Sequence, residues 1–540
     1  MSSSLGRASA ILGAGTLVSR ITGLVRTIVL VGVIGSNASA AADAFAVANQ
    51  LPNSVFNLIS VGVLTAVIVP QIVKAASHSD GGRAFISKLF TLGTVIVLIA
   101  TALAMIAAPW IVALYTPATA NPDQMALATA FAYWCLPQIF FYGLYSLLGE
   151  VLNARKVFGP YTWAPIVNNV VSLVGFGVFL LIFGGPNTAV DQWTPAMIAL
   201  LGGVATGGIV LQTVVLLVFW RRAGLRLRPD FQWRGVGLRH IGRLAGWTFL
   251  MVIVGQLAGI VQSRVLFEAS GNGPAVLASQ NAWLVFMLPY SLIVLSIGTP
   301  YFTQLSEHAA AGRDDSVRDD IIRSIRVLGL FIVAATAALV AASVPASRIF
   351  TNDSREAVAA APVLLCFLVC LLPLAVLFVI QRTFYAYNDT RTPFFFTLAQ
   401  GILVALTALG AGWALDAGIL PITELAAAIA LGQSLSSLVQ VIIATMILNR
   451  RLGGIGIREW LLPLGRFVLV GIPAGAAGWG VVLLCGGPEG WLSADRLTGV
   501  LGSALVGGAV LVVYIGILAL FRTPELAPAL ALGRRFLPKR

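Results

Sequence analysis

Runs of eighteen or more apolar residues recur along the whole chain, and they constrain its fold more than any other feature. A helical run of that length matches the roughly 30 Å hydrocarbon thickness of a bilayer. The composition agrees, since 58% of the 540 residues are hydrophobic and only 10% are charged, whereas soluble proteins are about 25% charged. The sequence therefore predicts an all-α protein that crosses a membrane many times, and it excludes a water-soluble globular domain.

The apolar stretches predict fourteen membrane-spanning helices. Their ranges are 8–33, 41–76, 84–115, 124–153, 160–184, 195–220, 243–267, 276–306, 325–350, 357–386, 392–415, 422–448, 463–485 and 496–521. An even number places both termini on one side, and the positive-inside rule assigns the basic side to the cytoplasm. Only Arg348, Arg355 and Arg496 fall in loops of the opposite side. Both termini are therefore predicted to be cytoplasmic.

The chain repeats itself at an offset of about 233 residues, so that spans one to six match spans seven to twelve in order and length. The clearest echo is a proline break, with Cys135-Leu136-Pro137 in span four and Cys370-Leu371-Leu372-Pro373 in span ten. This repeat predicts two six-helix lobes, residues 1–222 and 223–452, around a central cavity. Two more helices and a short basic tail make up residues 453–540.

Three arginines, Arg20, Arg26 and Arg264, lie inside predicted spans. A guanidinium there costs at least about 2.5 to 3.5 kcal/mol unless it faces water, a partner or a ligand. No acidic residue lies deep within any span, and the planar guanidinium fits phosphate oxygens. These arginines are therefore candidate ligands of an anionic substrate. The alternative is that they pair with backbone carbonyls or with an acid at a span end, such as Glu268 one turn from Arg264.

The sequence lacks the motifs that other classes of function require. Gly453-Gly454-Ile455-Gly456 has no lysine of a phosphate-binding loop, and no catalytic triad or carboxylate pair converges. The histidines His78, His240 and His308 are far apart and are interpreted as solvated loop residues. No catalytic residue, metal site or bound cofactor is expected. The formal charge of +13 is interpreted as membrane topology rather than nucleic-acid binding.

The longest predicted cytoplasmic loop joins spans six and seven and is strongly basic. We interpret its charge as topology plus attraction to anionic headgroups, carried by Arg221, Arg222, Arg226, Arg228, Arg234, Arg239 and Arg243. A second charged segment, residues 313–320, mixes both signs at helical spacing, which predicts a solvated helix without a function of its own.

Glu150 and Arg382 occupy equivalent points near the cytoplasmic ends of spans four and ten. The repeat predicts that they could meet as a gate salt bridge when the carrier opens outward.

Four motifs together identify a family. They are Ser19-Arg20-x-x-Gly23-x-x-Arg26; Ala42-Asp43-Ala44-Phe45 followed by Leu51-Pro52-Asn53 and Val69-Pro70; Leu152-Asn153-Ala154 with Pro160; and Phe384-Tyr385-Ala386-x-x-Asp389-Thr390-x-Thr392-Pro393. With these motifs the chain resembles, over essentially its whole length, the MurJ (MviN) family of lipid II flippases in the multidrug/oligosaccharidyl-lipid/polysaccharide exporter superfamily.

The resemblance implies a flippase of the bacterial plasma membrane that moves undecaprenyl-diphosphate-linked peptidoglycan precursor from the inner to the outer leaflet. It implies that Arg20 and Arg26 face the diphosphate, and we add Asn53 as a substrate contact. Asp43 and Asp389 are candidates for gating or coupling, with dependence on membrane potential or a cation gradient left open. The last two spans would form an apolar groove for the lipid tail, and cell-wall synthesis proteins are candidate partners.

This chain departs from many relatives at three positions. It has Thr27 where they carry an acid, and Phe56 and Leu284 where they carry arginines. We therefore suggest that Arg264 partly replaces the missing arginines. Three alternatives stay open: a flippase for another polyprenyl-diphosphate oligosaccharide, a multidrug antiporter, which would favour buried acids, and a membrane scaffold for cell-wall enzymes.

Overall fold

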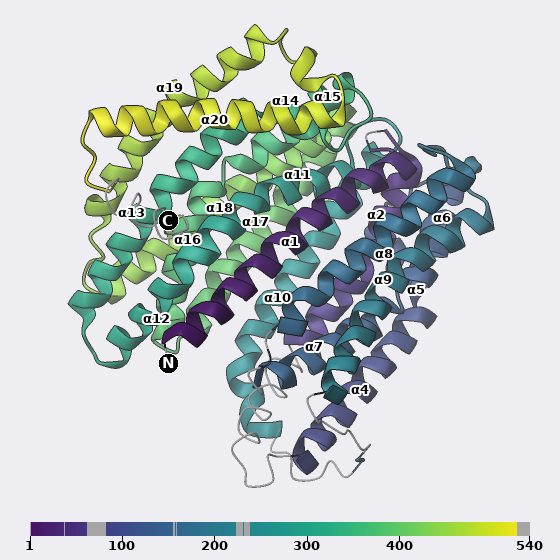
Figure 1. The fold of residues 1–540 in the computed structure, drawn as a ribbon, viewed down its shortest axis with the longest axis horizontal. Helices are drawn as coiled ribbons and strands as arrows, with labels where there is room; N and C mark the ends of the chain where they lie inside the picture. Colours follow the sequence, from purple (N-terminus) through teal and green to yellow (C-terminus); the bar gives the residue numbers. More distant parts are fainter. Residues whose placement is uncertain are drawn as a thin grey trace. The chain divides into compact units, whose positions relative to one another are not determined.

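The computed structural model describes residues 2–36, 38–61, 83–154, 157, 159–222, 230–231 and 238–525, and every long element in them is a helix (Figure 1). Val69-Pro70 and most of the basic loop between spans six and seven lie outside the described residues. The chain folds as two compact units, Met1–Gly271 and Asn272–Arg540, which we term the N-terminal unit and the C-terminal unit. The predicted lobe boundaries at residues 222 and 452 stay predictions.

The N-terminal unit is built from nine described helices. They are α1 (Ser2–Ile34), α2 (Ala40–Ile59), α4 (Arg83–Ile106), α5 (Ala108–Tyr115), α6 (Pro122–Cys135), α7 (Gln138–Ala154), α8 (Gly159–Phe183), α9 (Pro195–Arg222) and α10 (Leu238–Leu266). Short 3-10 turns follow α8 at Val190–Gln192 and α10 at Phe267–Ala269. Helix α8 packs between α1 and α9, while α2 packs on α6 and α7.

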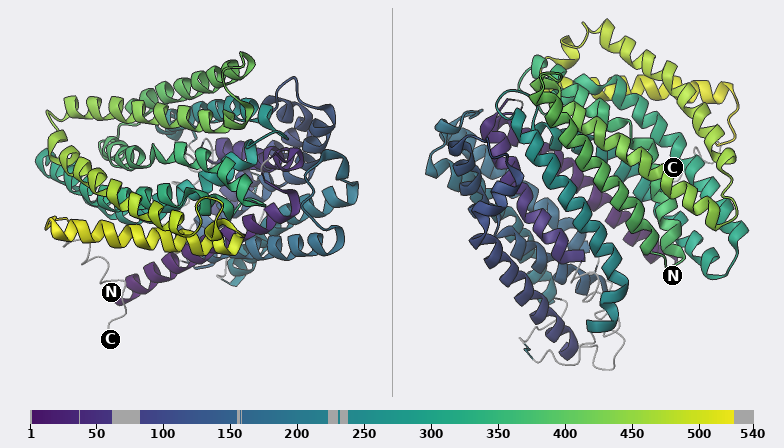
Figure 2. Two further views of the ribbon diagram at one scale, coloured as in Figure 1. Left: turned by 90° about the horizontal axis from the view of Figure 1, so that it is seen from above. Right: turned by 180° about the vertical axis from the view of Figure 1, so that it is seen from behind.

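The C-terminal unit continues with α11 (Val276–Pro289), a π-helical turn (Tyr290–Leu295), α12 (Ser296–Ala310), α13 (Asp314–Ala341), α14 (Ser343–Arg348), α15 (Ser354–Leu368), α16 (Leu371–Ala386), α17 (Arg391–Asp416), α18 (Leu425–Arg451), α19 (Ile457–Leu484) and α20 (Arg496–Leu520). Short 3-10 turns precede α18 at Ile422–Glu424 and α20 at Trp491–Ser493. Helices α19 and α20 lie at the edge of this unit, packed on α13 (Figures 1 and 2).

Twelve helical stretches among the described residues are long and apolar enough to cross a membrane. Helices α1 and α2 cover the first two predicted spans as far as residue 61. The prediction of an all-helical fold with about fourteen spans is confirmed. Several predicted spans are two helices in sequence, such as α4 with α5, and α13 begins at Asp314 rather than at residue 325. The two acidic residues of its first turn favour that earlier start, because they interact well with the helix dipole.

Both predicted proline breaks divide a helix, and each break is satisfied in the same way. Helix α6 ends at Cys135 and α7 begins at Gln138; α15 ends at Leu368 and α16 begins at Leu371. The hydroxyl of Thr206 on α9 donates to the Trp134 carbonyl (2.6 Å), and that of Ser434 on α18 donates to the Cys366 carbonyl (2.7 Å). In lipid, carbonyls freed by a break need such donors. The two units therefore repeat the break together with its cap.

In the C-terminal unit, loops that the charge pattern assigns to one side contact one another. On the predicted cytoplasmic side, Arg318 at the start of α13 pairs with Glu459 of α19 (2.7 Å). On the opposite side, Arg348 donates to the carbonyls of Ser493 (3.1 Å) and Ala494 (3.0 Å) in the loop before α20. This arrangement requires the even number of crossings that the sequence predicts between the paired loops.

Candidate substrate-binding site

Helix α1 carries Arg20 and Arg26, and an asparagine of α8 fixes its position. The amide of Asn169 donates to the Ser19 carbonyl (3.0 Å) and to the Thr22 hydroxyl (2.9 Å). Gly23 lies against the same side chain, since a Cβ atom there would be 3.6 Å from the Asn169 Nδ2. Asn169 is only 6% exposed. The Ser19 to Gly23 part of the first motif is therefore the seam by which α1 packs on α8.

This seam determines where Arg26 points. Residues three, four and seven apart share one face of a helix, so Arg26 lies on the stripe of Ser19, Thr22 and Gly23. The opposite stripe is exposed at Val18, Ile21 and Val25, as expected of a surface that faces lipid. Arg26 consequently points into the N-terminal unit.

An aromatic pair joins α2 and α7 in the same unit, where the rings of Tyr142 and Phe56 are 5.7 Å apart with their planes at 34°. Within the described residues, neither Arg20 nor Arg26 has an ion pair or a hydrogen-bond partner. Positive charge without an acid therefore lies inside this unit.

Asp43 is buried at the start of α2, with 1% of its surface exposed. The hydroxyl of Ser270 donates to its Oδ2 (2.7 Å), and Gln124 of α6 donates to that hydroxyl (2.8 Å) and to the Ala40 carbonyl (2.8 Å). Lower on the same helix, Gln256 of α10 donates to the Ser54 carbonyl (3.0 Å). Asp43 therefore joins the ends of α2, α6 and α10.

Arg264 lies near the end of α10, and its side chain is exposed. The described residues contain no ion pair between Arg264 and Glu268, the alternative that the sequence left open. Asn53, one residue after Pro52 in α2, is also exposed. Both side chains are thus available to a ligand, and their assignment to substrate stays a prediction.

Glu150 lies half-buried on α7, close to Tyr161 of α8. No ion pair of Glu150 occurs in the part of the chain that the structure describes. Nearby, the ring of Tyr161 stacks on Tyr145 (5.0 Å, 21°), whose hydroxyl donates to the Tyr161 carbonyl (2.6 Å). Pro165 has no N–H to donate to that carbonyl, so the Tyr145 hydroxyl replaces the missing helical hydrogen bond.

Arg382 belongs to the C-terminal unit. Its guanidinium lies 5.1 Å from the ring centroid of Phe302 and 5.2 Å from that of Phe378. Cation–π contacts of this kind stabilise a charge that has no acid beside it. The gate pairing of Arg382 with Glu150 stays a prediction.

Asp389 lies between the spans that end at Ala386 and begin at Arg391. It accepts the backbone N–H of Thr392 (2.9 Å) and the Thr392 hydroxyl (2.8 Å), and it pairs with Arg451 of α18. Burial alone would raise the pKa of Asp389, but the hydrogen bonds from Thr392 and Arg451 outweigh it and hold the pKa below its usual value. Asp389 therefore stabilises this loop, and its coupling role stays a prediction.

An apolar groove of about 690 Å³ runs along the C-terminal unit. Helices α13, α16 and α19 line it, with Val340, Leu372, Gly471, Gly475 and Trp479 among the lining residues. The two glycines deepen it, because neither places a side chain against α13. Such a groove suits a hydrocarbon chain.

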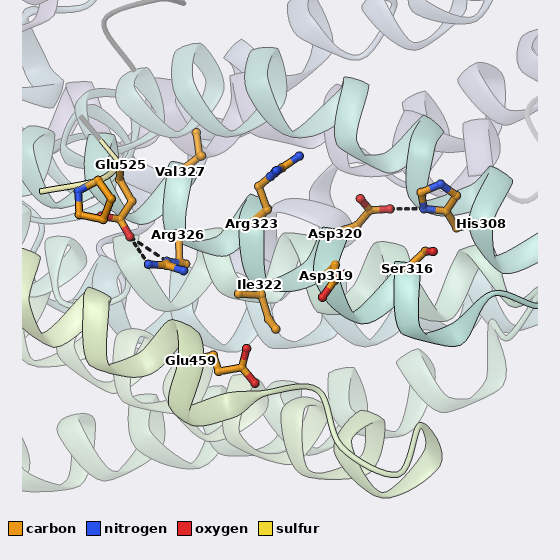
Figure 3. A pocket seen from close by; sticks show the side chains of 11 residues that line it. His308, Ser316, Asp319, Asp320, Ile322, Arg323, Arg326, Val327, Glu459 and Glu525 are labelled. Carbon is orange, nitrogen blue, oxygen red and sulfur yellow. Dashed lines mark hydrogen bonds and ion pairs between the residues drawn. The ribbon is translucent and has the colours of Figure 1, made fainter. Parts of the chain in front are cut away.

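A charged pocket of about 580 Å³ lies on the side of this unit that carries Glu459 and Glu525 (Figure 3). Figure 3 shows Arg326 turned toward Glu525 and Asp320 turned toward His308. Asp320 is 5% exposed, and His308 Nδ1 lies 2.7 Å from its Oδ2. The interpretation of His308 as a solvated residue is wrong, because the helical segment after residue 313 folds back onto α12. Two pairs of this pocket, Arg326 with Glu525 and His308 with Asp320, form within the fold.

Sequence reasoning missed Asn169 and Ser270. Neither belongs to a motif, and Asn169 contacts Ser19 across 150 residues. The signal available was weak: an asparagine inside an apolar span needs a partner.

Two units with the same order of helices, unpaired arginines in a span and an apolar groove define a multi-pass membrane transport protein. Comparison with known proteins specifies it further. Residues 33–486 match the family model "Lipid II flippase MurJ". The chain therefore belongs to this family, which comprises transporters rather than enzymes.

Individual relatives agree with the family. A probable lipid II flippase MurJ of Haemophilus influenzae is 27% identical over 421 residues, which cover 73% of this chain and 78% of the relative. Another from Synechocystis is 25% identical over 539 residues, 97% of this chain and 96% of the relative. Among solved structures, a lipid II flippase MurJ in an inward closed conformation has a TM-score of 0.70 at 18% identity and covers 94% of this chain and all of its own. An inward-facing MATE family multidrug transporter has a TM-score of 0.64 at 14% identity, with 83% of this chain and 98% of its own covered. These structural likenesses concern the fold.

Proposed function

We propose that this protein flips undecaprenyl-diphosphate-linked peptidoglycan precursor, lipid II, from the inner to the outer leaflet of the bacterial plasma membrane. The observation that carries the proposal is the pair of arginines on α1, Arg20 and Arg26, which have no acid or hydrogen-bond partner among the described residues. A diphosphate supplies the missing negative charge. Relatives over nearly the full length are named probable lipid II flippases.

We assign the diphosphate and the polyprenyl tail of the substrate to different sites. The diphosphate binds Arg20 and Arg26, with Asn53 and Arg264 as further contacts near the same helices. The polyprenyl tail occupies the groove between α13, α16 and α19. The sequence assigned the tail to spans thirteen and fourteen; α19 is span thirteen, and α20 does not line the groove.

Transport by alternating access needs a gate and an energy source. We keep Glu150 with Arg382 as the gate and Asp43 with Asp389 as the coupling candidates, driven by membrane potential or a cation gradient. If charge reversal at both Glu150 and Arg382 does not restore the activity that either single reversal abolishes, the gate is refuted.

We further propose that both termini are cytoplasmic. Support comes from the charge pattern of the loops and from Arg326, which pairs with Glu525 beyond the last span. The basic segment after α9 then faces anionic lipids of the inner leaflet, and cell-wall synthesis proteins reach the same side.

The test is rescue of a bacterium depleted of its own lipid II flippase, scored by precursor exposed on the outer leaflet. Wild type is compared with Arg20→Ala, Arg264→Ala and Arg458→Ala at matched membrane levels; Arg458 is an exposed control arginine at the start of α19. We expect rescue by wild type and Arg458→Ala, and loss in the other two.

Failure of well-expressed wild type to expose lipid II would refute the substrate. It would favour another polyprenyl-diphosphate-linked oligosaccharide as the substrate. The presence of Phe56 and Leu284, where we expect arginines in many relatives, supports that alternative. A scaffold protein would instead rescue growth with Arg20→Ala as well as with wild type.

A further inference from the structure

The charged pocket and the apolar groove of the C-terminal unit are built on the same two helices. Helix α13 lines the pocket with Arg326 and the groove with Val333 and Val340, and intervals of seven residues place these three on one face. Helix α19 contributes Glu459 to the pocket and Val468 to the groove. Arg326 and Val333 are about 10 Å apart along α13 at 1.5 Å per residue. This spacing is close to the thickness of one polar headgroup layer of a bilayer, about 5 to 8 Å.

An exposed stripe of α19 connects the pocket to the groove. Leu461, Gly465 and Val468 lie along it at helical spacing, followed by Ile472, and all four are exposed. Val468 and Ile472 line the groove, whereas Leu461 lies two residues after Glu459 of the pocket. An elongated molecule can therefore follow α19 from the charged pocket into the apolar groove.

Seven ionisable side chains line the pocket, and five of them pair within the fold. These pairs are Arg326 with Glu525, His308 with Asp320, and Glu459 with Arg318. The other two side chains, Asp319 and Arg323, have no ion pair or hydrogen bond among the described residues, although they lie one turn apart on α13. In Figure 3 their charged ends point in different directions. The pocket therefore offers one negative and one positive group to a ligand.

A ligand that complements both sites carries one charge of each sign and a hydrocarbon chain. A phospholipid with an ammonium headgroup has all three parts. Its phosphate suits the guanidinium of Arg323, its ammonium suits the carboxylate of Asp319, and an acyl chain suits the groove. An anionic phospholipid lacks the ammonium and leaves Asp319 without a partner. A free amino acid lacks the chain.

We propose that the C-terminal unit binds a zwitterionic phospholipid of the phosphatidylethanolamine type, with its headgroup at Asp319 and Arg323 and one acyl chain in the groove. This lipid is a second ligand, distinct from the transported substrate. It fills the groove until a polyprenyl tail displaces it. Binding of the phospholipid is independent of the proposed function, whereas its displacement rests on the tail assignment made there.

The experiment measures binding of phosphatidylethanolamine to the purified full-length protein in detergent, with phosphatidylglycerol titrated in parallel. The variants are Asp319→Asn, Arg323→Gln and Gly475→Leu, the last of which places a side chain in the groove. The matched controls are Asp315→Asn, on α13 outside the pocket, and Gly480→Leu, on α19 outside the groove with nothing within 4 Å of an added Cβ. Helix content and elution volume are compared first, so that misfolded protein is recognised.

We expect wild type to bind phosphatidylethanolamine more tightly than phosphatidylglycerol, and Arg323→Gln to weaken binding of both about fivefold. Asp319→Asn should weaken phosphatidylethanolamine binding and strengthen phosphatidylglycerol binding, because it removes an attraction to the ammonium and a repulsion of the anion. Gly475→Leu should weaken binding of both lipids, and the two controls should bind like wild type. The inference is overturned if wild type does not prefer phosphatidylethanolamine, if Arg323→Gln binds like wild type, or if Asp319→Asn shifts both lipids in the same direction.

Undecaprenyl diphosphate is then added to the wild-type complex with phosphatidylethanolamine. Release of the bound phospholipid supports a groove that the two lipids share. If phosphatidylethanolamine binds as expected but is not released, the phospholipid site stands, and the assignment of the polyprenyl tail to this groove is refuted.

Discussion

Replacing Asn169 by alanine should loosen α1, the helix that carries Arg20 and Arg26. The Asn169 amide makes two hydrogen bonds to α1, to the Ser19 carbonyl (3.0 Å) and the Thr22 hydroxyl (2.9 Å). Interhelical hydrogen bonds in membranes contribute about 0.6 kcal/mol on average and up to about 1.7 kcal/mol. Loss of both therefore predicts a decrease of about 1 to 3 kcal/mol in the free energy of unfolding.

The assay is reversible unfolding by SDS titration in mixed micelles, followed by circular dichroism. Asn168→Ala is the matched control, because the Asn168 Oδ1 is buried without a hydrogen-bond partner among the described residues. Its removal should cost little or stabilise the protein.

A double-mutant cycle with Thr22→Val isolates the direct contact. The coupling between Asn169→Ala and Thr22→Val should exceed about 0.5 kcal/mol, the limit within which independent sites are additive. Additive losses, or a cost of Asn169→Ala no greater than that of Asn168→Ala, would refute the seam as the element that positions Arg26. Flipping activity should fall with the same variant, because Arg26 shares the stripe that Asn169 holds.

Three further predictions concern stability. Arg348→Ala removes donors to three backbone carbonyls at a 5% exposed site and should lower the free energy of unfolding by about 2 to 4 kcal/mol. Exposed Arg355→Ala should change it by no more than about 0.5 kcal/mol in the same SDS titration. Gly149→Ala would place a Cβ atom 2.2 Å from the Tyr161 ring and should lower stability by about 1 to 3 kcal/mol; at Gly177, where nothing lies within 4 Å, alanine should be neutral or stabilising. Asp389→Asn should destabilise the protein by about 1 kcal/mol at neutral pH. Because hydrogen bonds lower the pKa of Asp389, the difference in stability between wild type and Asp389→Asn should be complete above the unfolded pKa of about 3.9 and disappear as pH falls through the folded pKa. A difference in stability that persists at low pH would contradict this prediction.

The sequence predicted those features that depend on local pattern. Apolar length located the spans, and the repeated Cys-Leu-Pro echo located the breaks at Pro137 and Pro373, because lipid imposes length and proline removes a donor whatever the neighbours are. The hydroxyl caps from Thr206 and Ser434 were not predictable, because each joins residues about seventy positions apart. The exact contacts of the charged segment 313–320 were equally beyond reach, since Arg318 meets Glu459 across 141 residues.

The sequence predicted only those members of the candidate site that carry a charge inside a span. Arg20 and Arg26 stand out because a guanidinium in a span is expensive. Which face of α1 Arg26 occupies depends on Asn169, a common residue type whose role exists only in the folded unit.

Described arginines differ in whether they pair with an acid. Arg318, Arg326 and Arg451 each pair with a carboxylate. Arg20 and Arg26 lie within α1 and have no such partner among the described residues. Charge without a partner inside a span is penalised by lipid, so these two arginines favour the binding of an anion.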